Sequence, residues 1–92
     1  MRLNWNDAKN AANLAKHGLS FEDASFVFSG PCVTFKDDRK NYGEPRFITL
    51  GVLVVRVVVI VHTPREGGTR IISMRKANDR EKEIYKKRLG TD

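Results

Sequence analysis

The stretch Arg70-Ile71-Ile72-Ser73-Met74-Arg75-Lys76-Ala77 decides the fold that we expect for this chain. Its alternating side chains are typical of a strand that runs directly into a helix. Ser73 and Arg75 would then share one face of a strand inside a sheet. Because a buried charge without a partner is costly, Arg75 needs an anionic partner or an open surface. The stretch therefore predicts a sheet with one side that can receive an anion.

The residues before this stretch predict two helices within one domain, residues 1–92, because the chain is too short for two domains. Asn6 can cap a first helix that ends at Gly18, and Ser20 can cap a second helix. Alanines recur at helical spacing in the first helix, at Ala8, Ala11, Ala12 and Ala15. This narrow alanine stripe predicts a helix that lies close against the sheet.

The remaining elements complete an α+β fold. We expect strands at Cys32–Lys36, Arg46–Leu53 and Arg56–Thr63, next to the strand quoted above. Asn78 can cap a C-terminal helix. The prediction is a small, mainly antiparallel sheet with the two N-terminal helices packed on one face, plus the C-terminal helix.

A register argument assigns the side chains to the two faces. If Pro64 faces Thr69 and Leu53 faces Arg56, opposed residues share a face. The first face then carries Val57, Val59, Val61, Ile72 and Met74. The second face carries Arg56, Val58, Ile60, His62, Ile71, Ser73 and Arg75, together with Phe47, Thr49 and Gly51. We expect the helices on the first face and an open cationic surface on the second. The Val54-Val55 turn is the weak point, because tight hairpins favour Asn-Gly or Asp-Gly.

Composition limits the possible functions. The net charge of +6 favours nucleic acid, an acidic protein or a membrane surface as partner. The single cysteine, Cys32, excludes an internal disulfide framework and suits the reducing cytoplasm. One cysteine and two separated histidines match no zinc spacing, so we expect no metal and no cofactor. The longest apolar run, Val57 to Val61, is too short to span a membrane, and no secretion signal opens the chain.

The candidate site residues each have a structural alternative. His62 is either a proton carrier or a packed histidine, and His17 with Lys16 is either functional or a helix C-terminal charge pair. Arg75 either binds phosphate or pairs with Glu81 or Glu83. Four further residues could equally be solvated, structural or part of the core edge: Arg46, Arg65, Arg70 and Tyr85.

The chain resembles the BrnT toxins of type II toxin–antitoxin systems. The resemblance runs from Trp5 to Tyr85 and lies in an ordered set of motifs. These are Trp5-Asn6-Asp7-x-Lys9, Asn13-x-x-Lys16-His17-Gly18, Phe21-Glu22-x-Ala24, Asp38-Arg39-x-x-Tyr42-Gly43-Glu44-x-Arg46, Gly51, Thr63-x-Arg65 and Arg70-Ile71-Ile72-Ser73-x-Arg75-Lys76-Ala77-x-x-x-Glu81-x-x-x-Tyr85. The resemblance implies a RelE-like fold, a ribonuclease that arrests translation, and a site on the sheet face away from the N-terminal helices.

The resemblance also implies a BrnA antitoxin, a heterotetramer of the pair, and DNA contact only through the antitoxin. It carries a site role to Lys16, His17, Arg46, Arg65, Arg70, Arg75 and Tyr85. Our hypothesis is metal-independent RNA cleavage, in which Arg75 and Arg65 bind phosphate, His62 or His17 moves protons, and Tyr85 positions the substrate. RNA binding would involve Lys16, Arg46, Arg56, Arg70 and Lys76. The alternative is a non-catalytic basic module that binds RNA or protein.

Overall fold

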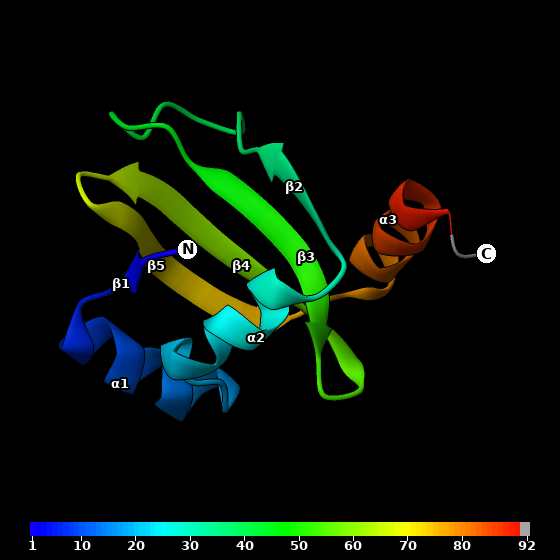
Figure 1. Ribbon diagram of the computed structural model, residues 1–92, viewed down its shortest axis with the longest axis horizontal. Helices are drawn as coiled ribbons and strands as arrows, with labels where there is room; N and C mark the ends of the chain where they lie inside the picture. Colours follow the sequence, from blue (N-terminus) through cyan, green and yellow to red (C-terminus); the bar gives the residue numbers. More distant parts are fainter. Residues whose placement is uncertain (91–92) are drawn as a thin grey trace.

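A computed structural model describes residues 1–90 of the chain (Figure 1). Its elements are β1 Leu3–Asn4, α1 Asp7–His17, the 3-10 turn η1 Phe21–Asp23, α2 Ala24–Ser29, β2 Cys32–Lys36, β3 Phe47–Leu53, β4 Arg56–Arg65, β5 Gly68–Lys76 and α3 Asp79–Leu89. The strands form one sheet in the order β1-β5-β4-β3-β2. Only the β1–β5 pair is parallel, so the sheet among the described residues is mixed.

The α+β class and the C-terminal helix of the sequence analysis are confirmed. Helix α3 begins with the expected capping box, in which the side chains of Asn78 and Glu81 each accept the other's backbone N–H. Residues 91–92, the end of the predicted domain, lie outside the described residues. Among residues 1–90, no helix is long and apolar enough to cross a membrane.

The predicted hairpin registers are partly correct. Leu53 pairs with Arg56, and Pro64 and His62 pair with Thr69 and Ile71, as expected. Between Val61 and His62, however, the register shifts by one residue at a β-bulge. Beyond the bulge Ser73 pairs with Val61 and Arg75 with Val59, instead of the expected Ile60 and Val58. A bulge moves every later side chain to the other face, so Arg75 and His62 lie on opposite sides of the sheet.

The face assigned to the N-terminal helices was wrong. Phe21, Ala24 and Val27 of η1 and α2 pack on the face that we expected to be open. Its buried residues from the sheet are Val58, Ile60, Ile71 and Met74. At Gly51 a Cβ atom would lie 2.6 Å from a methyl group of Val27, so glycine permits this close approach. The pattern did not distinguish the two faces, because both faces of β4 are apolar and the bulge leaves no trace in the alternation.

The alanine stripe prediction for α1 was also wrong. All four alanines are exposed, and the one buried residue of α1 is Asn13. The Asn13 side chain donates hydrogen bonds to the carbonyl oxygens of Leu19 and Met74, and it accepts one from the Met74 N–H. Its amide therefore bonds to the backbone of β5 at Met74. Helix α1 is thus joined to the sheet by a polar side chain.

Candidate functional site

The face of the sheet opposite α2, called the open face below, is only partly covered. Helix α3 packs over one end of it, where Tyr85 and Ala77 contact the row formed by Val33, Leu50 and Val59. The next row crosses four strands, and all of its members are partly exposed: Phe35, Ile48, Val61 and Ser73. A third row carries polar side chains. The open face therefore presents an uncovered, mostly apolar strip between α3 and a polar border.

Arg75 borders this strip beside α3. It ends the covered row opposite Val59, and 36% of its side chain is exposed. Its two terminal nitrogens donate to the two carboxylate oxygens of Glu81, each at 2.8 Å. This bidentate pair raises the pKa of Arg75 and lowers the pKa of Glu81. Glu81 also accepts the backbone N–H of Asn78, so the start of α3 fixes the guanidinium in place.

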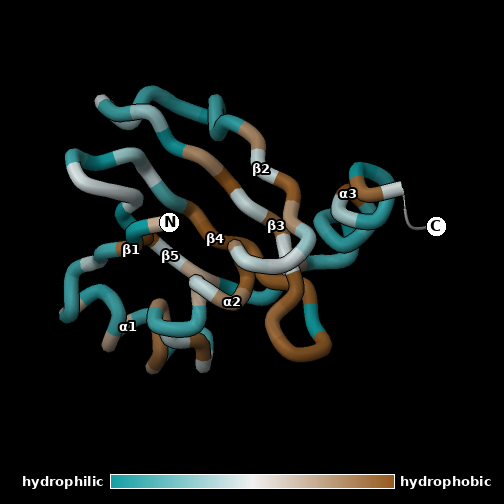
Figure 2. Tube along the Cα trace, in the orientation of Figure 1, coloured by the Kyte–Doolittle hydropathy of each residue, from teal (hydrophilic) through white to brown (hydrophobic). Residues whose placement is uncertain are grey.

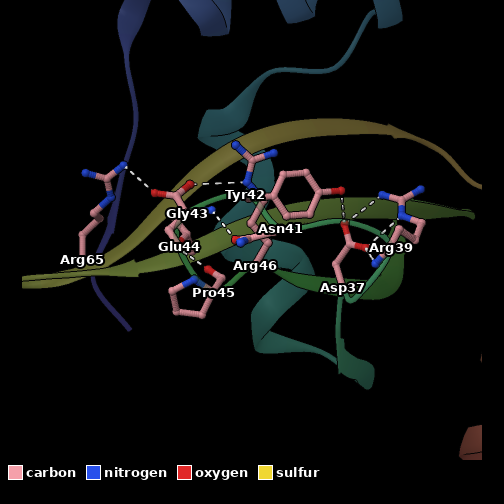
Figure 3. A network of polar contacts seen from close by, with 10 residues as sticks. Asp37, Arg39, Asn41, Tyr42, Gly43, Glu44, Pro45, Arg46 and Arg65 are labelled. Carbon is pink, nitrogen blue, oxygen red and sulfur yellow. Dashed lines mark hydrogen bonds and ion pairs between the residues drawn. The ribbon is translucent and has the colours of Figure 1, made fainter.

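Arg39, in the loop between β2 and β3, carries a second guanidinium group (Figure 3). It donates two bonds, at 2.8 and 2.9 Å, to the buried carboxylate of Asp37, to which the hydroxyl of Tyr42 also donates. The bond from Arg39 holds the pKa of Asp37 well below its usual range. The charge of Arg39 also adds to the pKa fall at Glu81 and opposes the rise at Arg75, so it acts on this pair.

The polar border continues through Glu44. This carboxylate pairs with Arg46 at 3.3 Å and with Arg65 at 3.2 Å (Figure 3). The guanidinium of Arg46 also lies 4.2 Å from the ring centre of Tyr42. Thr63 donates a short bond to the carbonyl of Pro45, which holds the end of the loop to β4. The loop between β2 and β3 therefore forms a border of ion pairs, in which acidic and basic residues are equal in number.

The comparisons with known proteins now assign the family. A family model described as "Ribonuclease toxin, BrnT, of type II toxin-antitoxin system" matches residues 5–81. The chain belongs to the BrnT family. A search of curated proteins finds no match. The BrnT match ends at Glu81, so it includes both members of the Arg75–Glu81 pair and the whole β2–β3 loop.

His62 lies apart from these BrnT residues. It is buried on the α2 face, where its ring lies 5.2 Å from Phe28 and stacks on Phe47. Its Nε2 shares a 2.7 Å hydrogen bond with the hydroxyl of Thr49, which in turn bonds to Thr34. Burial lowers the pKa of His62. The prediction that His62 and Arg75 share one face of the sheet was therefore wrong, because the bulge places them on opposite faces.

The other predicted residues are scattered over the molecule. Tyr85 is buried, and its hydroxyl donates to the Pro31 carbonyl, which anchors α3; burial also raises its pKa. Arg70 makes one long bond to Asn4, at 3.4 Å. Lys16 and His17 form the last turn of α1, while Arg56 and Lys76 lie at the far end of the sheet near the β3–β4 turn. Of the predicted set, the open face and its border bring together Arg75, Arg46, Arg65 and Arg70.

No site role was predicted for Arg39, Glu81 or Phe35. The motif from Asp38 to Arg46 indicated that the loop matters, but it did not predict where the side chain of Arg39 lies. The useful signal was the Asp37-x-Arg39 spacing followed by Tyr42, since an acid two residues before an arginine can fold a turn around one bidentate pair. Among residues 1–90, no three His, Cys, Asp or Glu side chains are grouped as a metal site.

Proposed function

We propose that this chain is an endoribonuclease that cleaves RNA without a metal ion, with the RNA strand lying along the open face. The family supports the ribonuclease activity. The location rests on one observation: a partly exposed row of apolar residues lies between Arg75 on one side and the β2–β3 loop, with Arg39 and Arg46, on the other. Arginines on both borders suit a strand whose phosphates need cations and whose bases need apolar surface.

Binding would use the borders and the strip differently. Phe35 and Ile48 offer apolar surface to unstacked bases, and stacking on an aromatic ring typically contributes about 1–3 kcal/mol per base. The guanidinium groups of Arg75 and Arg39 can each hold two phosphate oxygens. Arg75 is already oriented by a carboxylate, and a phosphate can replace that carboxylate because both present two oxygens to the same fork.

The chemistry follows from that exchange. The 2′-oxygen of the RNA forms a bond to the adjacent phosphorus, and the bond from phosphorus to the 5′-oxygen breaks. Arg75 and Arg39 stabilise the added negative charge. When Arg75 turns to the phosphate, the Glu81 carboxylate is released and accepts the 2′-hydroxyl proton, while water supplies a proton to the leaving oxygen. The products carry a 2′,3′-cyclic phosphate and a 5′-hydroxyl. His17 stays a prediction as a second proton carrier.

Replacement of Glu81 by Gln tests this proposal. Glutamine can still accept the Asn78 N–H, so the cap and the fold are retained. We expect the wild-type chain to cleave RNA in EDTA and Glu81→Gln to cleave about 10²–10⁴-fold more slowly, which is typical for loss of a general base. RNA binding should be unchanged or tighter, because Arg75 no longer has an anionic competitor. Glu83→Gln, on an exposed position of the same helix, is the matched control.

Two outcomes would oppose the proposal. If the wild-type chain cleaves RNA only when a divalent cation is added, the metal-independent mechanism is wrong. If the chain binds RNA in a salt-sensitive manner and yields no products, the non-catalytic basic module is the better description.

The partner assignments are proposals of the same kind. Membership of a type II toxin–antitoxin family supports an antitoxin partner. We infer a BrnA-type antitoxin, assembly with it as a heterotetramer, and DNA contact only through it. The RelE-like relationship of the fold, the arrest of translation and the cytoplasmic location also stay predictions that the resemblance implies.

A further inference from the structure

The β3–β4 turn, called the hairpin tip below, is the most apolar exposed part of the described chain (Figure 2). Val54 and Val55 are each 88% exposed, and Phe26 on α2 is 68% exposed. Two hollows flank Val54. The first is lined by Leu19 together with residues of the tip. The second is lined by Asp23, Phe26, Leu53 and Val54. The tip and α2 therefore form one apolar surface with shallow depressions, rather than scattered exposed residues.

The backbone of the tip makes these valines more unusual. Val54 has a φ of 62°, in the left-handed region that a β-branched residue rarely adopts. A glycine or an asparagine would form this turn at a lower conformational cost. Neither the stability of the hairpin nor its solubility explains an exposed valine pair in which Val54 is strained.

A cationic groove adjoins the tip. It is lined by Val55, Arg56, Val57, Lys76, Ala77 and Lys82. Within residues 1–90, Arg56 and Lys76 make no ion pair, and Lys82 has one long pair with the fully exposed Asp79. Three basic side chains with little compensating negative charge therefore lie beside the apolar hairpin tip. Two residues of the groove are also neighbours of the candidate site in the sequence, because Lys76 follows Arg75 and Lys82 follows Glu81.

We propose that the hairpin tip and the cationic groove dock an amphipathic, acidic helix of the antitoxin. This inference rests on the toxin–antitoxin family and not on the cleavage mechanism. The apolar side of such a helix would cover Val54, Val55 and Phe26, and its carboxylates would meet Arg56, Lys76 and Lys82. The side chains of the tip, rather than a row of free backbone groups, form the surface, which favours a helix over an added strand.

This placement would also explain neutralisation. A helix in the groove would lie over the start of α3 and the end of β5, beside the Arg75–Glu81 pair. If Arg75 has to leave Glu81 to bind phosphate, a partner that fixes the start of α3 keeps the pair closed. The antitoxin could then block cleavage without occupying the whole open face.

The double variant Val54→Gly with Val55→Asn tests the docking surface. It removes both apolar side chains and places glycine at the residue with a φ of 62°, so we expect the hairpin to be retained. The probe is the protein encoded by the reading frame next to the gene of this chain, produced alone. We expect its affinity for the double variant to fall at least tenfold by calorimetry, while RNA cleavage by the free variant is unchanged. The control is Leu14→Asn, at an exposed apolar residue on α1.

Lys82→Glu provides an independent arm. We expect it to weaken binding of the same protein, and we expect the loss to diminish at high salt. The proposal is overturned if the double variant binds as the wild type does, if the wild type does not bind the probe, or if the variant loses cleavage but keeps binding. It is also overturned if the tip proves to join two copies of this chain. Binding lost in the variant, with no cleavage by the wild type, would reject only the proposed mechanism.

Discussion

The two faces of this sheet are built from similar strands but differ in what covers them. On the α2 face, Phe21, Ala24 and Val27 bury the side chains below them, and even the polar His62 is enclosed there. On the open face, α3 covers one end and leaves a partly exposed row with Arg75 at its border. The comparison shows that burial, and not residue type, separates the packed histidine from the available arginine.

One residue of extra backbone produces this difference. Without the bulge in β5, Arg75 would lie on the same face as His62, as the register argument expected. With the bulge, Arg75 moves to the other side, where Glu81 can reach it. The catalytic hypothesis therefore changes from an arginine–histidine pair to an arginine–carboxylate pair.

Apart from Glu81→Gln, the largest expected effect is a loss of activity after Arg75→Ala. Removal of one preorganised charge-stabilising donor typically lowers the rate by about 10²–10³. His62→Ala should instead lower the free energy of unfolding, by about 2–4 kcal/mol, because it leaves a cavity between Phe28 and Phe47. The measurements are RNA cleavage with equal amounts of folded protein, and denaturation with urea.

Arg88→Ala, at an exposed position of α3, is the control for loss of positive charge. The comparison between the faces fails if His62→Ala abolishes cleavage in protein that is still folded. It also fails if Arg75→Ala cleaves at the wild-type rate.

A smaller effect on stability is expected for Asn13→Ala. This change leaves the N–H and carbonyl groups of Met74 without their side-chain partner, and each unsatisfied buried group costs about 1–3 kcal/mol. The loss should appear as a lower urea midpoint, with cleavage per folded molecule unchanged. An unchanged urea midpoint would mean that water replaces the Asn13 amide as hydrogen-bond partner of the Met74 backbone.

Much of the fold could be predicted from the sequence because its signals are local. Caps at Asn6, Ser20 and Asn78 mark where helical segments begin, and the long valine run marks a central strand. The face of the sheet on which Ser73 and Arg75 lie could not be predicted, because it depends on a β-bulge that leaves no mark in the amino-acid composition. The direction of Arg39 was hidden too, because it depends on a buried carboxylate within an otherwise polar loop.

The candidate site was predicted in part for the same reason. The arginine in the quoted stretch attracted attention because a charge inside a strand must be paired, and its pairing with Glu81 agrees with one of the alternatives considered. The histidines attracted attention by chemistry alone. Burial decides against His62, and only the folded chain contains that information.

The buried histidine should make stability depend on pH. Burial lowers the folded-state pKa of His62 below its ordinary value of 6.5, so the unfolded chain binds the proton first. Stability is therefore complete above about pH 6.5 and declines as the pH falls through this value, by at most about 1.4 kcal/mol per pH unit. His62→Phe keeps an aromatic ring between the two phenylalanines and should flatten this slope. Urea midpoints from pH 5 to 8 would show it, and an equal slope in both proteins would contradict it.

The smallest expected effect concerns the turn on which the register of both faces depends. Val54→Gly removes a side chain from a residue with a φ of 62°, where β-branched residues are strained. The relief exceeds the entropy cost of glycine, so we expect a gain of about 0.5–1 kcal/mol in the free energy of unfolding. Because Leu53 still pairs with Arg56, the two faces keep their residues and cleavage should not change. A changed cleavage rate would instead mean that the turn controls which side chains reach the open face.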